Sequence, residues 1–134
     1  METYTDTPYY SFAEETPDAL LGKEGLLVAL GTAKGTVKLA TSADEAIGVL
    51  FEKHGGNPHV NVRLLGKGGT VKVVAGGVIA KGARVTFGTG AKLVTQPTAA
   101  GSYRTLGRKL TQGSSANNDV IEILDVIEPI IVPA

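Results

Sequence analysis

The chain has 134 residues, enough for one hydrophobic core, and its 13 basic and 13 acidic side chains give a formal net charge of zero. This balance gives no support to a nucleic acid or an anionic membrane as the partner. Without cysteine, the chain has no disulfide, no catalytic thiolate and no cysteine-based metal site.

The composition also favours one class of fold. The 18 glycines and the absence of tryptophan indicate many turns around a core of Val, Leu, Ile and Ala. No run of about 18 apolar residues is present for a membrane span, and the first residues lack the basic start and apolar core of a signal peptide. We therefore expect an all-β protein made in the cytoplasm.

Residues 1–24 differ from the rest of the chain. Four of the seven tyrosine and phenylalanine residues lie in the first twelve positions, and prolines argue against a central strand here. We predict an extended N-terminal arm, which either folds back over its own barrel or anchors another surface through its aromatic side chains. These side chains are Tyr4, Tyr9, Tyr10 and Phe12.

Short apolar runs separated by glycine turns fill residues 25–126, for which we predict one β-barrel domain. At its centre lies the stretch 69–85, whose alternating valines indicate a strand and whose Gly76-Gly77 pair indicates a turn. The pattern is typical of a small barrel or sandwich with short hairpins. The expected strands are 26–30, 36–40, 47–52, 60–64, 70–74, 78–80, 84–87, 91–95, 105–110 and 119–124.

The order of these elements repeats at offsets of about 54 to 60 residues, which indicates an internal duplication. Two copies are too few for a solenoid, and we expect them to close into one pseudo-symmetric barrel. The matched positions include Ile47-Gly48 with Leu106-Gly107. The C-terminal tail, residues 127–134, is apolar and interrupted by proline, so it either seals an edge of the barrel or docks on a neighbour.

No pattern of catalytic residues stands out. His54 and His59 flank a turn, but a metal site would need more ligands than Glu52 supplies nearby, so we interpret both as solvent-facing. The glycines and lysine of residues 66–70 lack the spacing of a phosphate-binding loop and lead into a strand. We expect no enzymatic activity, no cofactor and no metal.

Charged pairs and clusters have structural interpretations as well. We interpret Glu14-Glu15 and Asp44-Glu45 as solvated or capping acids, because adjacent side chains on an extended chain point apart. The densest basic cluster, formed by Arg104, Arg108 and Lys109, lacks interleaved aromatic residues and is interpreted as a solvated strand face.

Four stretches of the chain carry a family resemblance: residues 60–65, the stretch 69–85, Gly107-Arg108 and residues 120–124. Together they resemble the tailed-phage capsid decoration (cement) proteins of the DUF2190 type. The likeness covers about residues 22–126, and the repeated Ile/Leu-Gly element resembles one of that family. The resemblance implies a small β-barrel protein on the outer surface of an icosahedral head, often a trimer, that stabilises contacts between major capsid protein subunits.

On this interpretation the chain is a structural virion protein with the major capsid protein as partner and no nucleic acid or membrane partner. The arm adds a strand to a capsid loop, and the tail makes a second contact through Ile130, Ile131 and Val132. A ligand- or carbohydrate-binding β module, such as a head-fibre component, remains the alternative; the scarcity of aromatic residues after residue 51 argues against a sugar-binding platform.

Overall fold

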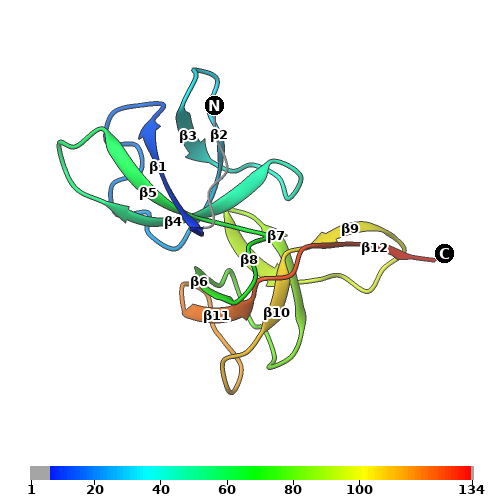
Figure 1. The fold of residues 1–134 in the computed structure, drawn as a ribbon. Coiled ribbons are helices and arrows are strands. Elements are labelled where there is room, and N and C mark those ends of the chain that lie inside the picture. Colours follow the sequence, from blue (N-terminus) through cyan, green and yellow to red (C-terminus); the bar gives the residue numbers. More distant parts are fainter. Residues whose placement is uncertain (1–6, 134) are drawn as a thin grey trace.

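The computed structural model describes residues 7–133, and within them the fold is all-β, as predicted. Figure 1 shows two groups of strands joined side by side, with a two-stranded extension that ends at the C-terminus. The strands are β1 (Tyr9–Glu14), β2 (Leu27–Leu30), β3 (Thr36–Leu39), β4 (Ala46–Lys53), β5 (His59–Leu64), β6 (Thr70–Val74), β7 (Arg84–Gly88), β8 (Lys92–Thr95), β9 (Gly101–Thr105), β10 (Gly107–Lys109), β11 (Val120–Leu124) and β12 (Glu128–Val132).

Strands β1 to β5 form a closed barrel in the order β1-β3-β2-β4-β5. Neighbouring strands are antiparallel except β1 and β3, which are parallel. Side chains that are at most 2% exposed fill the interior, and Phe12 packs against them. They are Leu20, Val28, Val37, Leu50, Val60 and Val62.

The second sheet has the order β6-β11-β10-β7-β8, and a single parallel bridge from Ala75 to Leu93 links its two ends. This sheet repeats the cyclic strand order and the strand directions of the barrel. The strands β6, β7, β8, β10 and β11 take the places of β1, β2, β3, β4 and β5, respectively. The predicted duplication is therefore confirmed. We call β1 to β5 the first copy, and β6, β7, β8, β10 and β11 the second copy.

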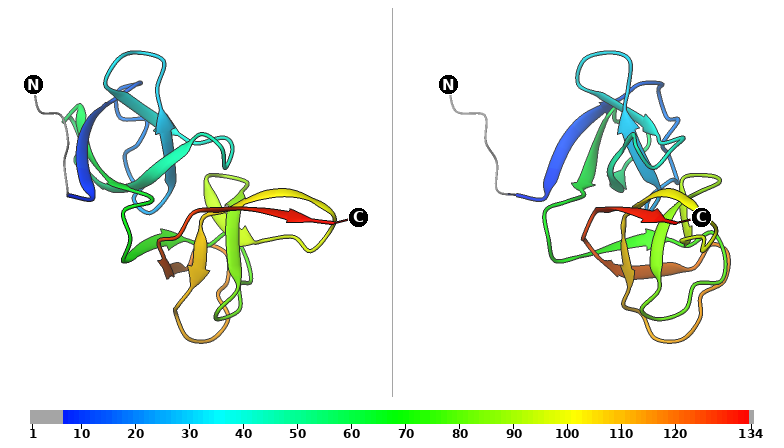
Figure 2. Two further views of the ribbon diagram at one scale, coloured as in Figure 1. Left: turned by 45° about the vertical axis from the view of Figure 1, so that its right-hand side comes forward. Right: turned by 90° about the vertical axis from the view of Figure 1, so that its right-hand side faces the viewer.

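The expectation that the two copies would close into one barrel is wrong, because each copy forms its own sheet. They nevertheless share a core. In β2, Val28 points into the barrel, whereas Leu27 and Ala29 point outward and pack with Val73, Leu93 and Ile123 of the second copy. Both faces of β2 are thus buried from Leu27 to Ala29, and the outer wall of the barrel becomes one side of the second core. Figure 2 shows the barrel next to the second copy.

The repeated Ile/Leu-Gly element has a steric reason in both copies. A Cβ atom added to Gly48 would lie 2.6 Å from the carbonyl oxygen of Arg63 on the adjacent strand. A Cβ added to Gly107 would collide with the carbonyl oxygen of Leu124, and the φ of Gly107 is 155°. Glycine at these two positions lets the partner strand approach closely.

The prediction that no central strand forms in residues 1–24 is wrong for Tyr9–Glu14. Strand β1 pairs with β5 from Tyr9 to Ala13 and with β3 at Ala13 and Glu14. Pro8 and Pro17 fall outside the strand, so they remove no hydrogen bond from its ladder. Within the predicted arm, residues Tyr9–Glu14 are thus a wall of the barrel.

The C-terminal segment pairs with a strand that the sequence did not predict. Strand β12 runs antiparallel to β9, from Glu128 opposite Thr105 to Val132 opposite Gly101. We call this pair the ribbon; it projects from the second copy and ends near the C-terminus (Figure 1).

The predicted strand at residues 78–80 does not form. The hydroxyl of Ser115 instead binds both the Ile79 N–H, at 3.1 Å, and the Gly77 carbonyl, at 2.8 Å.

Within residues 7–133 there is no helix with the length and apolar character that crossing a lipid bilayer requires.

Candidate functional site: a groove between the two copies

The residues considered for catalysis lie apart. His54 is exposed beside Glu52, with Nε2 3.3 Å from Oε2, and His59 is exposed at the start of β5. Across residues 7–133, no three His, Cys, Asp or Glu side chains gather as a metal site would require. The candidate site is therefore sought among the surface grooves.

The predicted basic cluster does not form one surface. The Arg104 guanidinium donates to the carbonyl oxygens of Ala43 and Asp44, at 3.0 and 2.8 Å, and thereby ties the ribbon to the first copy. Lys109 is 1% exposed, and only Arg108 of the three is exposed. The interpretation of Lys109 as part of a solvated face is wrong.

The acidic pairs also differ from expectation in one case. Glu45 accepts hydrogen bonds from the Thr41 N–H and hydroxyl, both at 2.6 Å, as expected of a capping acid. Glu14 is instead buried, and its Oε1 lies 3.0 Å from the Lys53 ammonium. Burial alone would raise the pKa of Glu14, but Lys53 and the N–H groups of Leu20 and Asp18 outweigh that effect and hold the pKa below its usual value. This pair stabilises the barrel end and is closed to ligands.

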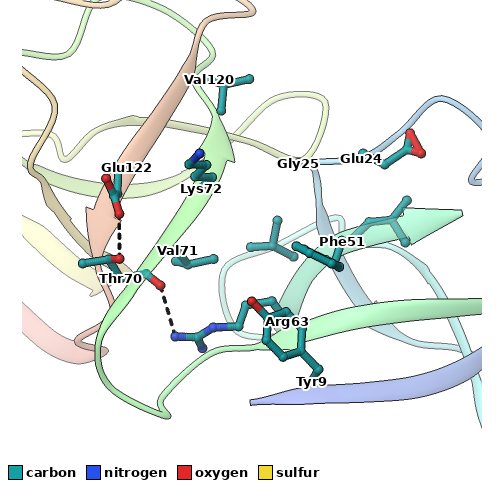
Figure 3. A pocket seen from close by; sticks show the side chains of 12 residues that line it. Tyr9, Glu24, Gly25, Phe51, Arg63, Thr70, Val71, Lys72, Val120 and Glu122 are labelled. Carbon is teal, nitrogen blue, oxygen red and sulfur yellow. Dashed lines mark hydrogen bonds between the residues drawn. The ribbon is translucent and has the colours of Figure 1, made fainter. Parts of the chain in front are cut away.

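A groove of about 440 Å³ lies where the outer face of the barrel meets β6 (Figure 3). The first copy contributes β1, β4 and β5 to its walls, and the second copy contributes β6 and β11. The lining residues are Tyr9, Glu24, Gly25, Val49, Leu50, Phe51, Arg63, Thr70, Val71, Lys72, Val120 and Glu122.

An aromatic pair forms the barrel side of this groove. The rings of Tyr9 and Phe51 are 4.9 Å apart and tilted by 59°, and the two residues are 44% and 56% exposed. Phe51 is the extra residue of a β-bulge, because Leu50 pairs with Val62 whereas Glu52 pairs with Asn61. Leu50 lies in the core, and the bulge leaves two successive residues, Phe51 and Glu52, exposed before Lys53 is buried again; Phe51 faces the groove.

A buried ion pair fixes the connection between the copies at the groove. Arg63 Nη1 lies 3.0 Å from Asp125 Oδ2, and both side chains are at most 7% exposed. Asp125 also accepts the N–H groups of Gly66 and Lys67, at 2.8 and 3.0 Å. Arg63 Nη2 donates to the Thr70 carbonyl at 3.3 Å, which holds the start of β6. Since Asp125 balances the charge of Arg63, this guanidinium adds no net charge to the groove.

Strand β6 turns one unpaired stretch of backbone toward the groove. Val71 and Val73 bond to β11, so the alternation of an antiparallel ladder directs the N–H and C=O of Lys72 to the opposite side. On that side the Thr70 carbonyl meets Arg63, and the Val74 N–H donates to the Gly25 carbonyl at 2.9 Å. Between these two contacts, no residue in the range 7–133 pairs with the backbone of Lys72.

Gly25 makes this close approach of the two copies sterically feasible. Its φ is 89°, and an added Cβ would lie 2.8 Å from Val74 Cγ2. A side chain here would push the first copy away from β6.

The predicted contact residues fall on separate surfaces. Tyr9 lines the groove, and Tyr10 is 50% exposed with its ring 4.9 Å from that of Phe12, which is anchored on the barrel core. Ile131 is 77% exposed on the ribbon, while Ile130 and Val132 are half-buried. Tyr4 lies outside the described residues.

The sequence did not predict the groove residues of β4, β6 and β11, namely Phe51, Lys72 and Val120. Phe51 was placed within a strand, where regular alternation does not reveal a bulge, and Lys72 has the form of any outward-facing strand residue. Val120, 62% exposed, opposes Val74 only through long-range pairing. The aromatic character of Tyr9 and Phe51 was the one signal available.

Comparison with protein-family models finds no match to this chain, and comparison with curated proteins finds none either.

Proposed function

We propose that the chain is a structural virion protein that binds the outer surface of a tailed-phage icosahedral head and stabilises contacts between major capsid protein subunits. The sequence resemblance over about residues 22–126 suggests this function. The structural observation that favours it is the presence of exposed apolar side chains on two separate surfaces, the groove with Phe51 and the ribbon with Ile131. Exposed apolar patches commonly mark protein–protein contacts.

Two surfaces suit a protein that bridges subunits. Contact with one capsid subunit raises the effective concentration of the second surface near a neighbouring subunit, so two weak contacts give strong overall binding. A protein that binds only the assembled, expanded head also stabilises that state by mass action. The proposal includes a homotrimer as the bound form.

The test is to mix purified protein with heads assembled without it and to measure bound protein by sedimentation and light scattering. We expect saturable binding and heads that withstand heating better after loading. The double variant Phe51→Ala, Ile131→Ala should bind more weakly than a control in which Leu30, 58% exposed in β2, is replaced by Ala. Wild-type protein that does not bind such heads would contradict the proposal.

A ligand-binding β module is the second candidate, and the Tyr9–Phe51 pair is the observation that favours it. Exposed aromatic rings beside a groove can stack on sugar rings, and Glu24 and Glu122 could bind hydroxyl groups there. A glycan array distinguishes the two candidates: saturable binding that Tyr9→Ala abolishes would favour this candidate, and an empty array would favour the capsid proposal.

A further inference from the structure

The β6 edge combines three features that point to one kind of ligand. It presents a backbone N–H and C=O from Lys72, it faces an aromatic pair, and contacts with Arg63 and Gly25 limit the open stretch at both ends. We infer that the groove binds an extended polypeptide segment that adds as a short strand along β6 and places a basic side chain between the groove carboxylates. This inference rests on the proposed function, under which the segment belongs to the major capsid protein.

The backbone geometry favours a polypeptide over other ligands. A neighbouring strand runs about 4.8 Å away and presents an N–H and a C=O on the same side of one residue. Lys72 offers the complementary acceptor and donor, so one residue of the added strand can make both hydrogen bonds. The flanking contacts of Thr70 and Val74 restrict this ladder to a short segment.

The charges at the groove favour a basic residue in that segment. Glu24 and Glu122 are free of ion pairs with other residues of the described range 7–133, whereas Arg63 is balanced by Asp125. With Arg63 and Asp125 counted as a neutral pair, the other charged lining residues, Glu24, Glu122 and Lys72, carry one net negative charge (Figure 3). Tyr9 and Phe51 add ring faces that attract a cation. An Arg or Lys side chain meets both demands.

Two strand residues whose backbone N–H has no partner within residues 7–133, Lys72 and Ser11, allow a matched backbone test. Lys72→Pro removes the N–H that faces the groove, whereas Lys72→Ala keeps it and removes only the ammonium. Ser11 in β1 is the control position, because its N–H points away from β5, has no partner among residues 7–133 and lies outside the groove. Ser11→Pro therefore removes an equally unpaired N–H from a strand outside the groove.

The experiment measures the dissociation constant of each variant for heads assembled without the protein, after thermal unfolding has shown that the variant folds. We expect Lys72→Pro and Phe51→Ala each to bind about tenfold more weakly, and Glu24→Gln with Glu122→Gln to bind several-fold more weakly. Lys72→Ala should bind at least as tightly as wild type, and Ser11→Pro should be unchanged.

The outcomes separate this inference from the proposed function. If wild-type protein loads saturably and folded Phe51→Ala and Lys72→Pro load equally well, the groove is not the binding site, although the capsid proposal stands. If Lys72→Pro fails to fold, unchanged loading by Phe51→Ala and by the double glutamine variant overturns the inference alone. If wild-type protein does not bind heads, both the function and the inference are wrong.

Discussion

The two copies of the fold use the same strand order but differ in how their first strand is held. In the first copy, β1 joins β3 at two successive residues, Ala13 and Glu14, and closes a barrel. In the second copy, β6 meets β8 only through the bridge from Ala75, and the preceding Val74 N–H binds Gly25 of the first copy instead. The contacts of Val74 with Gly25 and of Thr70 with Arg63 thus flank the unpaired Lys72 backbone, which lies in the groove between the copies.

A second difference lies at the ends of the equivalent strands β4 and β10, each of which places a buried lysine beneath the loop that follows. Lys53 Nζ donates to the His54 carbonyl and lies 3.0 Å from carboxylate oxygens of both Glu14 and Asp18. Lys109 Nζ donates only to carbonyls, those of Thr111 and Gly113, and no carboxylate within residues 7–133 lies close enough to pair with it. Both lysines hold a loop, but only the first also neutralises a buried acid.

Substitution of the glycines of the repeated Ile/Leu-Gly element, Gly48 and Gly107, should give the largest loss of stability. Gly107→Ala should lower the free energy of unfolding by about 2–6 kcal/mol, because a clash with the Leu124 carbonyl adds to the backbone strain of an alanine at this φ. Gly48→Ala should cost about 1–3 kcal/mol, from the clash alone. Gly77→Ala, which meets no atom within 4 Å, is the control and should be near neutral in urea denaturation. Equal stability of all three variants would show that neither glycine is required by the repeat.

The buried lysines sharpen the contrast between the copies. Lys53→Met leaves the Glu14 carboxylate buried without its cation and should cost about 3–5 kcal/mol. Lys109→Met leaves only two loop carbonyls without a donor and should cost about 1–3 kcal/mol. Urea denaturation of both variants measures the difference, and a larger cost for Lys109→Met would reverse the comparison.

The junction between the copies gives an intermediate effect. Asp125→Asn keeps the size of the side chain but removes the charge that pairs with Arg63, so we expect a loss of about 1.5–3 kcal/mol. Amide hydrogen exchange should also become faster at Gly66 and Lys67, whose N–H groups bind this carboxylate. Asp119→Asn, at an exposed loop acid that accepts the Ala116 N–H, serves as the control. Because the asparagine oxygen can still accept one of these two N–H groups, unchanged exchange at both Gly66 and Lys67 would mean that the Asp125 carboxylate does not hold the connection.

Acid should weaken the first copy through Glu14. Its pKa is lowered from 4.5 in the folded state, so its contribution is fully present above pH 4.5 and is lost as the pH falls through the folded pKa. The free energy of unfolding should therefore decrease as the pH falls below about 4.5. Glu14→Gln should reduce that slope by up to about 1.4 kcal/mol per pH unit, since one fewer proton is taken up on unfolding. Identical slopes in urea denaturation would contradict this assignment.

The sequence predicted the strands better than it predicted their partners. Alternating runs such as 60–64 and 70–74 lie close to β5 and β6, because local periodicity reflects one buried face. Strand β1 was missed because its aromatic residues resemble anchors for another surface, although Phe12 packs on the barrel core. The site was less predictable, since Arg63 pairs with Asp125 across 62 positions and buried charged side chains have no local signature.

Amide hydrogen exchange at Lys72, before and after the protein is loaded onto heads, tests the central claim most directly. The account predicts fast exchange at Lys72 in the free protein, between slowly exchanging Val71 and Val73, which bond to β11. Loading should make Lys72 exchange slowly as well, because the added strand supplies its acceptor. Slow exchange in the free protein would show that the β6 edge is already closed, and fast exchange in the loaded protein would show that no strand adds there.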